Sequence, residues 1–83
     1  MNYSLSTNTS FTGLNLPESV LEQAVKLLNA IDQAYTAEEL GRAAGRAEGF
    51  VLGIETVKAL NAASIEGLYL AFDNAASARL QGA

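Results

Sequence analysis

The chain has 83 residues, which is enough for one domain whose core lies near the lower limit of independent stability. It contains no cysteine and no histidine, which excludes disulfides, thiolate metal sites and imidazole chemistry. Nine carboxylates and five basic side chains give a net charge of −4, which argues against broad binding to phosphate backbones. This charge suits a soluble chain, or one that binds a basic surface such as the nucleic-acid groove of another protein.

The chain begins with a segment rich in Ser, Thr and Asn that has no helical period. We expect residues 1–14 to form a polar N-terminal arm, partly ordered because Phe11 and Leu14 can pack on the body of the protein. Residues 15–83 are expected to form a single helical domain, with helices at about 17–35, 37–60 and 62–80.

The first helix is expected over residues 17–35. Pro17 suits the first turn, and Asn15 with Glu18 can form a capping pair. Apolar residues then recur at intervals of three and four, which predicts one buried stripe. Its members are Val20, Leu21, Ala24, Leu27, Leu28, Ile31 and Tyr35.

The second helix is expected over residues 37–60. Thr36 as N-cap and Glu39 three positions later match a capping box. Asn61 is placed either to close this helix or to cap the next one. The apolar side of the helix consists of Leu40, Ala43, Ala47, Phe50, Val51, Ile54 and Val57.

The third helix is expected over residues 62–80, with alanine dominating its second half. Its stripe is formed by Ile65, Leu68, Tyr69, Phe72, Ala75, Ala76 and Leu80. Short connections favour antiparallel neighbours. The predicted fold is therefore all-α, either a three-helix bundle or a helical hairpin plus a third helix, with a polar N-terminal arm.

The second helix carries a row of glycines four residues apart. A glycine inside a helix costs about 1 kcal/mol relative to alanine, so four of them cost about 4 kcal/mol. On a helical wheel the row lies opposite the apolar side, where it forms a candidate interface with its neighbours. The members are Gly41, Gly45, Gly49, Gly53, Leu52, Arg42, Glu38 and Thr56.

Small residues spaced in this way let two helix backbones approach closely. We expect a symmetric homodimer that crosses at Gly45 and Gly49, since a twofold contact uses one patch twice. A helix of another protein can use the same surface. The simpler interpretation is a solvent-facing helix side that tolerates glycine.

One segment supports a different interpretation. The run Thr36-Ala-Glu-Glu-Leu-Gly-Arg-Ala-Ala-Gly resembles the first helix and turn of repressor-type helix-turn-helix domains, and Ile54-Glu55 matches a pair that those domains carry later. The resemblance implies a turn at Gly45 and DNA binding. The segment departs from the family at Arg46 and Ala47, and the would-be recognition helix from Glu48 offers no Arg, Lys, Asn or Gln for base edges.

Residues for catalysis, for a cofactor or for a metal are not found. No nucleophile–base pair can be assembled, and the glycines do not form a phosphate-binding loop. The carboxylate pairs, Glu18 with Glu22 and Glu38 with Glu39, are typical of solvated helix faces and first turns. We therefore expect no enzyme activity, no cofactor and no metal.

The sequence thus predicts a non-enzymatic protein-binding module, acting as a small regulator or stoichiometric inhibitor of another macromolecule. A phage or mobile-element anti-defence (anti-CRISPR-like) role fits its size and acidity, and a helix-turn-helix-like DNA-binding regulator is the alternative. We expect another protein as partner, a homodimer and no nucleic acid. The chain shows no 18-residue uncharged apolar run and no secretory signal at its start, so no membrane contact and a cytoplasmic location are expected.

Overall fold

The computed structural model describes residues 10–11 and 13–82. Within them lie three helices and no strand. The helices are α2 (Glu18–Asp32), α3 (Ala37–Thr56) and α4 (Ala62–Gly82). Most of the predicted N-terminal arm, residues 1–9 and 12, lies outside the described residues.

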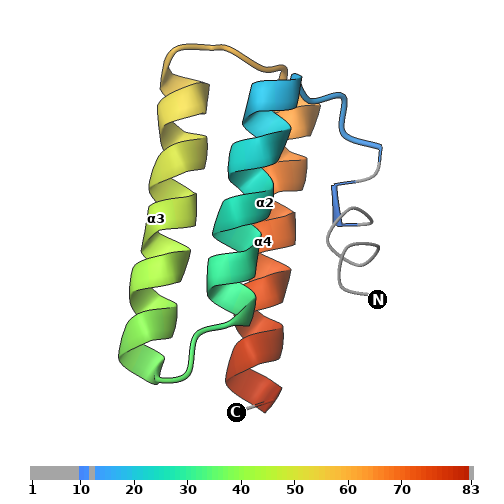
Figure 1. Ribbon diagram of the computed structural model, residues 1–83. Helices are drawn as coiled ribbons and strands as arrows, with labels where there is room; N and C mark the ends of the chain where they lie inside the picture. The colour runs from blue at the N-terminus through green and yellow to red at the C-terminus, as the bar shows by residue number, and fades with distance from the viewer. Residues whose placement is uncertain (1–9, 12, 83) are drawn as a thin grey trace.

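The three helices lie side by side, and each packs against the other two (Figure 1). Successive helices run in opposite directions because each connection is short. This arrangement confirms the all-α prediction and, of its two versions, selects the three-helix bundle over a helical hairpin plus a third helix.

Each helix contributes at least one large, fully buried side chain to the core. Ile31 of α2, Val51 of α3 and Leu68 of α4 are the largest of these. Each belongs to the apolar stripe predicted for its helix. The three-residue and four-residue spacing of the stripes therefore fixes how each helix is rotated about its axis.

Two residues before α2 pack against α4. Phe11 is buried, and its ring meets that of Phe72 edge to face, with centroids 5.8 Å apart and planes at 68°. Leu14 is half-buried over Gly67 of α4. A β-carbon at position 67 would crowd the Leu14 side chain, coming within 3.2 Å of its Cγ. Glycine at this position therefore makes room for Leu14, and the expected packing of Phe11 and Leu14 is present.

Helix α2 begins and ends differently from the prediction. The N-cap is Pro17, with no side-chain cap hydrogen bond, so the predicted capping pair of Asn15 and Glu18 is wrong. The helix ends at Asp32 rather than residue 35, which leaves Tyr35 outside the apolar stripe and 86% exposed.

The connection from α2 to α3 is held by α4. Ala34 is buried there, and its carbonyl oxygen accepts a hydrogen bond of 2.7 Å from Arg79 Nε. Helix α4 continues to Gly82, and Leu80, which the stripe placed in the core, is 63% exposed. Arg79, rather than Leu80, therefore makes the contact near the end of α4.

Helix α3 ends at Thr56, four residues before the predicted end. Lys58 follows in the left-handed conformation, with φ of 57°, and its N–H donates to Glu55 O at 3.0 Å. Ala59 N–H donates to Ile54 O at 3.1 Å, which completes a Schellman motif. Val57, predicted on the core side, is 71% exposed because it lies at the end of the helix.

The N-cap residues predicted for the second and third helices, Thr36 and Asn61, both cap a helix in the structure. Thr36 Oγ1 accepts from Glu39 N–H at 3.0 Å, whereas the Glu39 carboxylate reaches back to Tyr35 N–H at 2.8 Å rather than to Thr36. Asn61 caps α4, since its Oδ1 accepts from Ser64 N–H at 2.8 Å. Of the two roles open to Asn61, the structure selects the second.

Substitution of Lys58 by glycine should stabilise the protein. A left-handed conformation costs an L-residue about 1–2 kcal/mol, and glycine adopts it without that strain. We expect Lys58→Gly to raise the free energy of unfolding by about 1 kcal/mol in urea titrations. Lys58→Ala removes the same charge but keeps the β-carbon, so it should give no such gain. An equal gain in both variants would contradict the role of backbone strain.

The contact between Leu14 and Gly67 should appear as a coupling between two substitutions. Alanine in place of a helical glycine normally gains about 1 kcal/mol. We expect Gly67→Ala to give that gain in a Leu14→Ala background but not in the native chain, because Leu14 occupies the space. The free energies of unfolding of the four proteins in this double-mutant cycle measure the coupling, and additive effects would contradict the contact.

Candidate functional site

The structure places the four glycines of α3 on an exposed side of the helix. Gly41, Gly45, Gly49 and Gly53 are all solvent-exposed, whereas the buried residues of α3 lie on its other side. The helix runs without a break through all four. The predicted position of the glycine row opposite the core is therefore confirmed. We call the surface formed by these glycines with Leu52, Arg42, Glu38 and Thr56 the glycine face.

Among the described residues, nothing fills the space above these glycines. A β-carbon added at any of the four would meet no atom within 4 Å beyond the helix's own backbone and adjoining residues. Gly67 differs, because there the Leu14 side chain occupies that space. The packing of the described chain therefore explains Gly67 and does not explain the row on α3.

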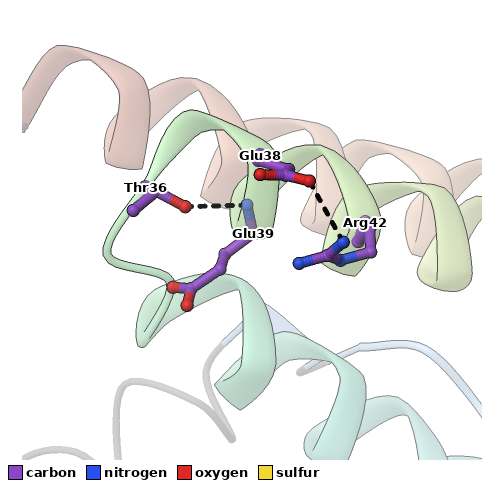
Figure 2. A network of polar contacts seen from close by, with 4 residues as sticks. All are labelled: Thr36, Glu38, Glu39 and Arg42. Atoms are coloured by element: carbon purple, nitrogen blue, oxygen red, sulfur yellow. Dashed lines mark hydrogen bonds and ion pairs between the residues drawn. The ribbon is translucent and has the colours of Figure 1, made fainter.

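The other members of the glycine face leave its surface open. Leu52 is 54% exposed, and Thr56 Oγ1 donates to Leu52 O at 2.8 Å, so the hydroxyl is turned back onto its own helix. Glu38 and Arg42 form an ion pair of 3.3 Å one helical turn apart, beside the capping residues Thr36 and Glu39 (Figure 2). Both side chains of the pair are largely exposed, which limits its contribution to stability to about 0.3–0.5 kcal/mol.

The continuity of α3 also bears on the resemblance to helix-turn-helix domains. That resemblance implies a turn directly after Gly45, between a first helix and a recognition helix. The structure instead has one helix from Ala37 to Thr56. The geometry that the resemblance implies is absent from this segment.

A second surface lies between α3 and α4, where two adjoining hollows share Glu66 and Tyr69. Their volumes are about 300 and about 440 Å³. Apolar and aromatic groups form much of the lining, including Phe72, Leu70 and Ile65. We call this surface the acidic groove, because four carboxylates line it: Glu48, Glu55, Glu66 and Asp73.

The charges of the acidic groove are mostly unpaired within the described chain. Lys58 is the one basic residue among those lining the two hollows. Glu55 accepts a hydrogen bond of 3.2 Å from the Tyr69 hydroxyl, whereas none of the four carboxylates lies in an ion pair with a described basic side chain. The groove therefore carries an excess of negative charge over an apolar floor.

The negative charge of the acidic groove affects the pKa of Tyr69. Partial burial raises the pKa of its phenol, and the hydrogen bond to Glu55 and the negative charges of Glu55 and Glu48 raise that pKa further. The hydroxyl, like that of an ordinary tyrosine, is protonated at neutral pH, and it donates to Glu55. Tyr69 and Phe72 both belong to the apolar stripe predicted for the third helix. Phe72 is buried in the core, and Tyr69 forms part of the groove wall.

Sequence reasoning did not find the acidic groove, although a signal for it is present. Glu48 and Glu55 are seven residues apart on α3, and Glu66 and Asp73 are seven apart on α4. Residues at this spacing lie two helical turns apart on one side of a helix. The repeat becomes visible as a surface only when α3 and α4 are placed next to each other.

Within the described residues, no group of three or more Asp, Glu, His or Cys side chains is arranged to hold a metal ion. The carboxylate pairs noted in the sequence, Glu18 with Glu22 and Glu38 with Glu39, are exposed. In the described part of the chain, no helix is both long enough and apolar enough to cross a bilayer. The glycine face exposes helix backbone without side chains, and the acidic groove places negative charge around an apolar floor.

Comparison with protein-family models, with curated proteins and with solved structures finds no match for this chain.

Proposed function

We propose that this chain is a non-enzymatic protein-binding module that acts as a small cytoplasmic regulator or stoichiometric inhibitor of another macromolecule. Its working surface in this proposal is the glycine face of α3. An anti-defence role in a phage or mobile element, of the anti-CRISPR kind, fits a small acidic chain and forms the most specific version of the proposal.

The observation that supports this function is the empty space above the four glycines. Each glycine costs about 1 kcal/mol relative to alanine, and a whole domain has only about 5–15 kcal/mol of stability. At every one of the four positions, a methyl group would fit without a clash against any described residue. Contact with another chain gives the glycines a purpose, because a partner helix can approach the bare backbone and gain dispersion and Cα–H···O contacts.

A second copy of the chain is the simplest occupant of the glycine face. A twofold axis near Gly45 and Gly49 would set the same surface against itself. Leu52, which is 54% exposed beside the glycines, would become buried in that contact. The Glu38–Arg42 pair would lie at the polar rim.

The alternative function is a DNA-binding regulator. Its support is limited to the sequence resemblance at Thr36–Gly45 and at Ile54-Glu55, because α3 continues past Gly45 without a turn. The net charge of −4 also opposes binding to a phosphate backbone. Retention of the native protein on duplex DNA at low salt, lost at high salt, would favour this alternative over the protein-binding function.

Substitutions at the glycine face should separate stability from association. In the monomer, at protein concentrations too low for association, Gly45→Ala and Gly49→Ala should each raise the free energy of unfolding by about 1 kcal/mol, because the methyl groups enter open space. Gly45→Leu and Gly49→Leu should keep the helix but prevent close approach. Light scattering should therefore find a dimer for the native chain and monomers for the leucine variants. Ala78→Leu places the same side chain at an exposed position of α4 and should leave the dimer intact.

A monomeric native chain would contradict the homodimer and leave another protein as the occupant. Affinity capture with the native chain, with Gly45→Leu/Gly49→Leu and with Ala78→Leu distinguishes the remaining cases. We expect a protein retained by the native chain and by Ala78→Leu but not by the double variant. Identical retention by all three chains would show that the glycine face is not the interface.

A further inference from the structure

The acidic groove is long enough to hold one more helix. On α4 its lining runs from Ala62 to Ala76, which spans about 21 Å at about 1.5 Å per residue. Helix α3 forms the other wall and runs antiparallel to α4. A helix of about 14 residues would therefore fit along it, on an apolar floor that includes Phe72 and the exposed Leu70.

The four carboxylates are regularly spaced along the acidic groove. Glu48 and Asp73 line one hollow, Glu55 lines the other, and Glu66 lines both. On each wall the two carboxylates are seven residues apart, or about 10.5 Å along the helix. Seven residues is also the repeat of helices that pack side by side, in which charged residues next to the apolar seam select the partner.

We propose that the acidic groove binds a cationic amphipathic helix of another protein, one with apolar residues along its seam and Arg or Lys seven residues apart beside it. The occupant is chosen by charge complementarity: four carboxylates without an ion-pair partner in the described chain surround the apolar floor, against one lysine. A second copy of this acidic chain in the groove would set carboxylates against carboxylates. Binding would extend the three-helix bundle by a fourth helix.

This proposal concerns a different surface from the glycine face and does not depend on it. Glu48 and Glu55 are the α3 carboxylates that line the groove, whereas none of the four glycines is among the residues that line it. A helix in the groove would gain affinity from ion pairs with a low-dielectric floor on one side. Its binding should therefore weaken as salt is raised, because exposed charges are screened.

The test uses two synthetic peptides of about 14 residues with the same leucine seam, one with arginines at the flanking positions and one with glutamates there. Fluorescence anisotropy measures their binding to the full chain. We expect the arginine peptide to bind and the glutamate peptide not to bind. Binding of both peptides, or of neither, would overturn the proposal.

Two matched pairs of variants locate the site. Glu48→Gln/Glu66→Gln removes two groove carboxylates, and Glu18→Gln/Glu22→Gln removes two exposed carboxylates on α2, so both proteins lose the same charge. We expect the first to weaken binding of the arginine peptide about tenfold or more and the second to weaken it less than about twofold. Equal losses would show binding to overall charge and would overturn the proposal.

The apolar part of the contact is tested without a change of charge. Leu70→Ser alters an exposed leucine in the groove, and Leu80→Ser alters an exposed leucine near the end of α4, outside it. Only Leu70→Ser should weaken binding. The variant Gly45→Leu should bind the arginine peptide as the native chain does, so failure of the glycine-face proposal and failure of this one are distinguishable. Loss of peptide binding in Gly45→Leu alone would place the peptide elsewhere and overturn the proposal.

Discussion

Burial of one large side chain from each helix, Ile31, Val51 and Leu68, is the constraint on which the rest of this structure depends. A small bundle has one core, and each helix can turn only one side towards it. Once Val51 is in the core, the opposite side of α3 must face solvent. The glycine face and the α3 wall of the acidic groove are both consequences of that rotation.

The sequence predicted the helices and their core sides well, because periodicity reports which residues are buried together. Its errors lie where a helix ends. Tyr35, Val57 and Leu80 continue an apolar period on paper, but each lies beyond or at the end of the packed segment and is exposed. Periodicity carries no information on where the neighbouring helix stops.

The two proposed surfaces differ in how much of each could be predicted from the sequence. The glycine row lies on a single helix, so a helical wheel was sufficient to place it. The acidic groove needs two helices, and the relation between Glu48 and Asp73 depends on the register of α3 against α4. Gly67 was missed for the same reason, since its purpose is contact with Leu14, which lies 53 residues earlier.

Both surfaces use α3, but they rest on different physical interactions. Contact at the glycine face depends on short-range dispersion between backbones, which salt does not screen, and it requires small residues on the partner. Contact at the acidic groove depends on charge, so it is long-range and salt-sensitive, and it tolerates imperfect fit. An acidic chain of this kind can attract a basic partner through the groove before any close packing forms. The exposed Leu52 and Leu70 then provide apolar area at each surface, which charge alone cannot supply.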